Sequence, residues 1–155
     1  MKDRIKIDLI GLYLLAFFVS LIATSVKAYY SSSDQLIRTL VYIGVAGGLG
    51  GTIFCIRSFY KHLISKDEPF DLKWTWWYIF RPFISIAIGE FVYFLIVGGL
   101  LSVGSISQVD FSKSVMFYCA LAFLGGFSFT QFANKLEELA STVFASNKET
   151  KEKEK

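Results

Sequence analysis

Apolar residues gather in four long runs along the chain, separated by short polar or charged segments. The runs cover residues 7–26, 36–56, 76–101 and 114–132. Each is close to the roughly 20 residues that an α-helix needs to cross the hydrocarbon core of a bilayer. The pattern therefore predicts an all-α fold, a membrane bundle of four transmembrane helices.

The first run has a second interpretation, a cleaved signal peptide, because Val26-Lys27-Ala28 loosely resembles a cleavage site. However, the run is longer than the roughly 7–15 apolar residues of a typical signal peptide. Lys27 would also lie directly beside the cut. The sequence favours a membrane anchor.

The fourth run passes into a segment with a helical apolar stripe. Between residues 131 and 145, apolar side chains recur at steps of three and four with charges opposite, at Phe132, Leu136, Leu139, Ala140 and Val143. Such a stripe is typical of a helix that lies on a membrane surface or packs against a partner. We expect an amphipathic extension that closes a single domain over residues 1–146. The Lys/Glu-rich residues 147–155 predict a disordered tail.

Basic residues lie mainly on one side of the predicted membrane. Thirteen of the sixteen Lys and Arg residues fall in residues 1–6, in residues 57–73 together with Arg81, and in the C-terminal segment. The positive-inside bias then predicts a multi-pass protein of the inner (cell) membrane with both termini cytoplasmic. Cys55 and Cys119 would lie near opposite faces, so we expect no disulfide within one chain.

Aromatic and basic side chains flank the predicted spans. Tryptophan and tyrosine favour the headgroup layer, and arginine can extend its charge to that layer from just inside the hydrocarbon. We expect interfacial anchors at Arg57, His62, Trp74, Trp76, Trp77 and Arg81. The only histidine has no cysteine or second histidine at metal-ligand spacing, so an anchoring role is favoured over a metal site.

Glycines form a potential packing face in the second and fourth predicted helices. Glycines four residues apart let another backbone approach closely, which drives helix association in lipid. We expect helix-packing roles for Gly44, Gly47, Gly48, Gly51, Gly125 and Gly126. The contact could lie within the chain or between protomers. The alternative is that glycine is simply common in membrane helices.

Glu90 is the one carboxylate within the third run. At ~1.5 Å per residue it lies roughly 13 Å along the helix from Arg81, near the bilayer midplane, and it faces the opposite way. A charge at that depth costs about 2.5–3.5 kcal/mol even on the lenient scale. Three solutions remain open: a neutral acid that donates a hydrogen bond, a wet cavity within a ring of protomers, or a cation on a partner. Tyr93, one turn on, is a candidate neighbour.

Composition supports a membrane protein and excludes several other classes. The chain is 54% hydrophobic with a mean hydropathy of +0.49, above the roughly 45–50% apolar content of soluble domains. Its basic residues form no patch interleaved with aromatics, so we expect no nucleic-acid partner. No HExxH, P-loop, GxSxG or paired-acid motif is present, so we predict no catalytic residue, no metal and no cofactor, and favour a non-enzymatic role.

Several short motifs follow one another over about residues 40–145. They are Arg57-Ser58-Phe59 with His62, Trp77-Tyr78, Arg81-Pro82, Gly98-Gly99-Leu100-Leu101, and Leu124-Gly125-Gly126-Phe127-Ser128 with Lys135-Leu136. Together they resemble a group of small bacterial four-helix integral membrane proteins of uncharacterised function. The resemblance implies a fold and a membrane, and no substrate. In that group the position of Glu90 is usually small or apolar, which counts against a shared catalytic role for it.

Two hypotheses for function follow from the sequence. The first is a homo-oligomeric assembly that forms an ion-conducting or membrane-perturbing pore, suggested by Glu90 and the glycine spacings. The second is a membrane-anchored interaction subunit that docks a protein partner through its cytoplasmic C-terminal helix. The expected partners are the lipid bilayer, further copies of the chain and, in the second case, that protein.

Overall fold

A computed structural model describes residues 2–31, 34–64, 72–98 and 111–152. Over these residues the chain is helical and contains no strand, which confirms the predicted all-α class. The elements are α1 (Lys2–Ser31), α2 (Gln35–Ile64), the short 3₁₀ helix η1 (Leu72–Trp74), α3 (Thr75–Val97), α4 (Phe111–Phe127) and α5 (Phe129–Glu152).

Three of these helices are long and apolar enough to cross a membrane, over Ile5–Ser31, Gln35–Ile64 and Thr75–Val97. A fourth candidate is a bent pair, Val115–Phe127 followed by Phe129–Glu138, whose two parts meet at 99°. The described chain is thus compatible with a multi-pass membrane protein.

The first two helices extend beyond the predicted apolar runs 7–26 and 36–56, because α1 and α2 each contain 30 residues. Hydropathy marks only the part of a helix that suits lipid. The flanking residues continue the helix because no glycine or proline interrupts them and because lysine and arginine are good helix formers. At the other predicted boundary, α3 ends at Val97, and residues 99–101 of the predicted third run lie outside the described residues.

The C-terminal part differs most from the prediction. Instead of continuing to residue 132, the fourth helix ends at Phe127, and a new helix begins at Phe129. The backbone of residues 147–152, predicted to be disordered, continues α5 as far as Glu152. Lysine and glutamate both favour helices, and oppositely charged pairs at helical spacing add to that preference.

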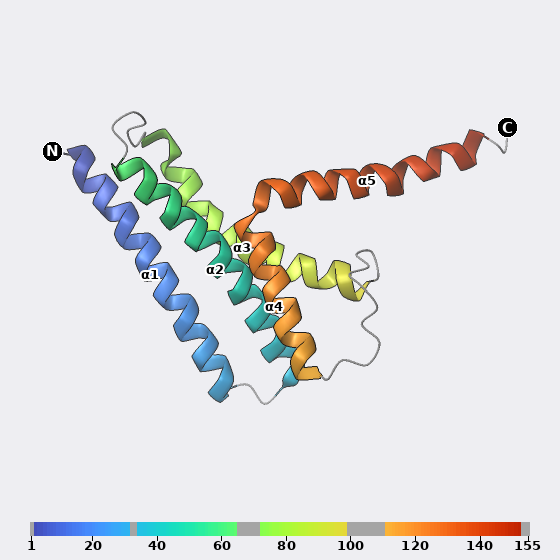
Figure 1. Ribbon diagram of the computed structural model, residues 1–155, viewed down its shortest axis with the longest axis horizontal. Helices are drawn as coiled ribbons and strands as arrows, with labels where there is room; N and C mark the ends of the chain where they lie inside the picture. Colours follow the sequence, from blue (N-terminus) through green and yellow to red (C-terminus); the bar gives the residue numbers. More distant parts are fainter. Residues whose placement is uncertain (1, 32–33, 65–71, 99–110, 153–155) are drawn as a thin grey trace.

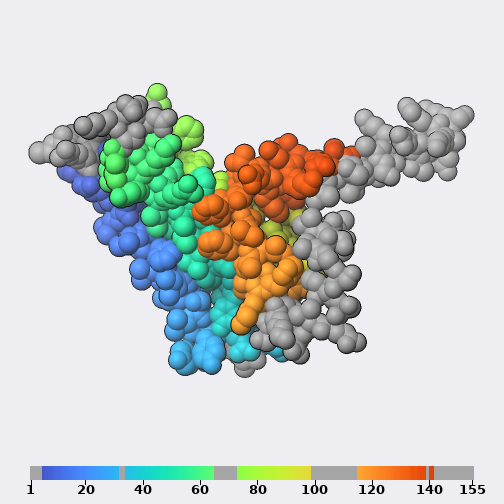
Figure 2. Space-filling view, in the orientation of Figure 1, coloured from blue at the N-terminus to red at the C-terminus, as the bar shows by residue number. Residues whose placement is uncertain are grey.

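α2 is the central helix of the bundle and packs against α1, α3 and α4. Figures 1 and 2 show α1 along one flank and α5 projecting from the opposite one. The glycine face of α2 makes the closest contacts. A Cβ at Gly47 would lie 2.5 Å from the Ser85 carbonyl oxygen and 2.8 Å from Gly89 Cα, both on α3. A Cβ at Gly50 would lie 2.2 Å from the Phe123 carbonyl oxygen on α4. These glycines therefore face other helices of the same chain.

α1 attaches to the bundle along one stripe. Ile10 and Leu14 are buried in a cluster with Cys55 and Tyr78, and the Tyr13 hydroxyl donates to the Ile79 carbonyl oxygen at 3.0 Å. The opposite side of α1 is apolar and exposed, at Ile5, Leu9, Leu12, Leu15, Val19, Ile22 and Val26. α1 is therefore apolar both on the side that packs against the bundle and on the side that does not. A helix at the edge of a membrane bundle has this pattern, because its outer side contacts lipid.

The turn at Ser128 directs α5 away from the bundle (Figure 1). The Ser128 amide donates to the Leu124 carbonyl at 2.8 Å, and the Phe132 amide donates to the Ser128 carbonyl at 3.0 Å. Ser128 therefore ends one helix and starts the next. Gly125 and Gly126 precede it, and glycine together with serine is a recognised cause of a sharp change in helix direction.

Candidate functional site

Glu90 and Tyr93, the predicted membrane-embedded polar pair, lie against different helices. Glu90 is half-buried on α3, and a Cβ at Gly44 of α2 would lie 3.0 Å from its Oε1. The Tyr93 ring instead contacts that of Tyr118 on α4, with centroids 5.1 Å apart. Among the described residues, no hydrogen bond or ion pair connects Glu90 to another side chain. The two residues do not form one site.

Most predicted interfacial anchors gather at one end of the bundle, where α2 ends and α3 begins. Arg57 is exposed there, as are Trp74 and Trp76, and His62 is half-buried. Trp77 is half-buried, and its ring packs edge-on against that of Phe54. The exposed tryptophans have the arrangement of an aromatic belt. Trp77 and Arg81, one turn later, differ because they face the interior of the bundle.

The sequence predicts an outward-reaching anchor at Arg81. In the structure, the Arg81 side chain is only 5% exposed. Its guanidinium carbon lies 4.4 Å from the ring centroid of Phe129, 5.0 Å from that of Phe54 and 5.5 Å from that of Trp77. Arg81 is buried because the turn between α4 and α5 brings Phe129 over its side chain. That contact joins residues 48 positions apart, and no local signal in the sequence indicates it.

The guanidinium of Arg81 lacks a carboxylate partner among the described residues, and its buried Nε has no hydrogen-bond acceptor. Aromatic faces attract the cation, but they do not replace the acceptors that its five N–H groups need. Burial of an unsatisfied charged donor is costly. This is the least satisfied polar group described in the interior of the bundle.

Ser85 fixes the backbone beside Arg81. Its fully buried hydroxyl donates to the Arg81 carbonyl oxygen at 2.9 Å, with the Gly126 carbonyl oxygen of α4 at 3.4 Å. A Cβ at Gly51 would lie 2.0 Å from the Ser85 hydroxyl, so α2 also needs glycine here. The end of α4 is thereby held against α3, which places the start of α5 next to Arg81.

A cavity of about 220 Å³ lies between Arg81 and the first turn of α5. Its lining consists of Phe54, Arg81, Phe127, Ser128, Phe129, Thr130 and Gln131. The volume is several times the roughly 30 Å³ that one water molecule occupies in the liquid. The cavity thus combines a buried cation, aromatic walls and the N-terminus of a helix.

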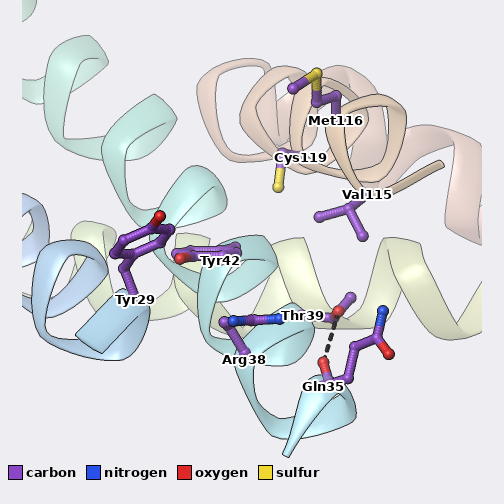
Figure 3. A pocket seen from close by; sticks show the side chains of 8 residues that line it. All are labelled: Tyr29, Gln35, Arg38, Thr39, Tyr42, Val115, Met116 and Cys119. Atoms are coloured by element: carbon purple, nitrogen blue, oxygen red, sulfur yellow. Dashed lines mark hydrogen bonds between the residues drawn. The ribbon is translucent and has the colours of Figure 1, made fainter. Parts of the chain in front are cut away.

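A larger cavity, of about 510 Å³, lies near the other end of the bundle (Figure 3). It is lined by Tyr29, Gln35, Arg38, Thr39, Tyr42, Val115, Met116 and Cys119. Among the described residues, the lining contains neither a carboxylate nor a histidine, and the Thr39 hydroxyl donates to the Gln35 carbonyl within the same helix at 2.9 Å.

Two further features bear on chemistry. Within the described part of the chain, no group of three or more His, Cys, Asp or Glu side chains could hold a metal ion. Cys55 and Cys119 are both free, and Cys55 is buried in the cluster that holds α1.

Comparison of the chain with protein-family models, with curated proteins and with solved structures finds no match in any of the three. The resemblance to small bacterial four-helix membrane proteins therefore stays a prediction.

Proposed function

We propose that this protein is a non-enzymatic interaction subunit of the inner membrane. It crosses the bilayer four times, keeps both termini in the cytoplasm, and carries α5 along the cytoplasmic membrane surface. The observation that carries the proposal is the 99° angle between α4 and α5. If α4 crosses the membrane, a helix at right angles to it lies parallel to the bilayer plane. Most Lys and Arg residues lie in the terminal segments and in the connection between α2 and α3, and this bias supports a cytoplasmic position for these parts of the chain.

The direction of the apolar stripe on α5 supports an interfacial position. Phe132 lines a cavity of about 430 Å³ together with Val92 and Ile96 of α3 and with Leu121 and Leu124 of α4. The stripe therefore starts on the side of α5 that faces the apolar flank of the bundle. An amphipathic helix in this position buries its apolar face at the boundary between headgroups and acyl chains.

The polar side of α5 is available to a protein partner. Lys135, Glu137 and Glu138 are exposed, and Lys135 forms an ion pair with Glu138. These three charges sum to −1, so attraction to anionic lipid contributes little, and the apolar face carries the attachment. The acidic side chains are left facing the cytoplasm, where a partner with a basic surface would match them.

Photocrosslinking from the full-length protein in cells tests this function. A photoreactive residue at position 137 should give a discrete protein adduct, and Glu138→Lys in the same chain should weaken the adduct about fivefold by removing charge complementarity. The matched control is position 124 on the exposed side of α4, where the adducts should be lipid. No protein adduct at position 137, or the same protein adducts at both positions, would contradict the proposal.

A pore is the second candidate, and it rests on Glu90. The half-buried carboxylate has no polar side-chain partner among the described residues. A carboxylate that faces a water-filled space between protomers needs no such partner. The glycine spacings give this candidate no support, because Gly47 and Gly51 pack against α3 of the same chain. A ring of protomers is required, so a monomeric protein in nanodiscs would exclude the pore.

A further inference from the structure

The first turn of α5 lines the Arg81 cavity and begins with unpaired backbone donors. Helices leave their first amides without an intrahelical acceptor. Here the first amide bonded within α5 is that of Phe132, which reaches the Ser128 carbonyl. The amides of Phe129, Thr130 and Gln131 precede it, and no acceptor for them occurs among the described residues. These three residues also line the cavity.

Arg81 is the second, independent feature. It is 5% exposed, belongs to another helix, and lines the same cavity with its Nε unpartnered. The helix N-terminus contributes roughly half a positive charge in addition to the full charge of the guanidinium. Two positive groups therefore lie at one space, and no aspartate or glutamate is among the described residues that line it.

We propose that this cavity binds a phosphate group, held by the Arg81 guanidinium and by the amides at the start of α5. Tetrahedral phosphate oxygens match both donors: guanidinium binds them through paired N–H groups, and helix N-termini bind them through backbone amides. The ligand gives the first amides of α5 the acceptor that they lack among the described residues. Phe54, Trp77 and Phe129 flank the cation and limit its access to water.

The phosphate has two sources with the same chemistry. One is the phosphodiester of a membrane lipid, which lies at the depth where an interfacial α5 would begin. The other is free inorganic phosphate from the cytoplasm. The site does not depend on a protein partner for α5, so the proposed docking function can fail while this site stands.

Thr130 allows a substitution that changes the charge of the site without altering its packing. Its side chain is exposed and lines the cavity at the second residue of α5. Thr130→Glu introduces a carboxylate that competes for the same donors and also suits a helix N-terminus, so the fold should be retained. Thr130→Gln has nearly the same shape without the charge and serves as the matched control.

Binding is measured on the full-length, delipidated protein in uncharged detergent. In one arm phosphatidylglycerol is titrated and counted by native mass spectrometry, and in the other inorganic phosphate is titrated by calorimetry. We expect saturable binding in at least one arm, weakened about tenfold or more by Thr130→Glu and less than about twofold by Thr130→Gln. Arg81→Lys, which keeps the charge but loses the paired donors, should also weaken binding.

Each outcome decides the proposal. Saturable lipid binding that Thr130→Glu weakens identifies a lipid phosphodiester site, and saturable phosphate binding alone identifies a free-phosphate site. Binding in neither arm, or equal binding by the Glu and Gln variants, overturns it. Equal binding by the two variants would mean that the ligand binds elsewhere and that water hydrates Arg81.

Discussion

Gly126→Ala should destabilise the bundle severely, whereas Gly125→Ala, one residue earlier, should be tolerated. A Cβ at Gly126 would lie 2.1 Å from the Gly47 carbonyl oxygen and 2.9 Å from its carbonyl carbon. Both are backbone atoms of a packed helix and cannot rotate aside, so α2 and α4 would have to separate. Overpacking costs about 1–3 kcal/mol when side chains yield, and we expect about 3 kcal/mol or more here.

Gly125 is the matched control because its new methyl group would meet only side chains. A Cβ there would lie 3.2 Å from Val92 Cγ2 and 3.3 Å from Ile88 Cγ2, contacts that a small shift relieves. Unfolding of both variants in mixed detergent micelles gives the two free energies. Equal losses at the two positions would show that α4 does not pack on Gly47 as described.

Leu14→Ala should also be strongly destabilising, whereas Leu15→Ala should change little. Leu14 is 1% exposed and fills the cluster that joins α1 to α2 and α3. Within a membrane the hydrophobic transfer term between helices is small, but the lost van der Waals contacts and the remaining void still count. We expect a loss of about 2 kcal/mol, at the lower end of the range for buried leucine in water.

Leu15 tests whether this effect depends on the packed face. It is 59% exposed on the other side of α1, so its truncation should stay within about 0.5 kcal/mol. The same micelle unfolding assay compares the two variants. A larger loss at Leu15 than at Leu14 would mean that α1 packs through the face assigned here to lipid.

The helices could be predicted because a bilayer requires a minimum length and an apolar composition of any helix that crosses it, and these helices meet both requirements. Those constraints act locally, so the runs at 7–26 and 36–56 locate α1 and α2 well. They say nothing about where a helix continues into water. The extensions of both helices therefore came only from the structure.

The site could not be predicted, because it depends on contacts between distant segments. The sequence indicates that Gly47 and Gly126 suit close packing, but not that they pack against each other. The position of Arg81 near the start of the third apolar run predicts an interfacial anchor. Its burial follows from the turn at Ser128 and from the Phe129 ring above it, neither of which has a signal near residue 81.

Spin labels at residues 135 and 136 test whether α5 lies on the membrane surface. In nanodiscs, with Cys55 and Cys119 replaced by alanine, a label at position 136 on the apolar stripe should be reached mainly by oxygen, which concentrates in lipid. A label at position 135 should be reached mainly by a water-soluble nickel complex, because Lys135 is exposed on the polar side. Equal access of the nickel complex to both positions would contradict an interfacial α5, because the helix would then lie free in water.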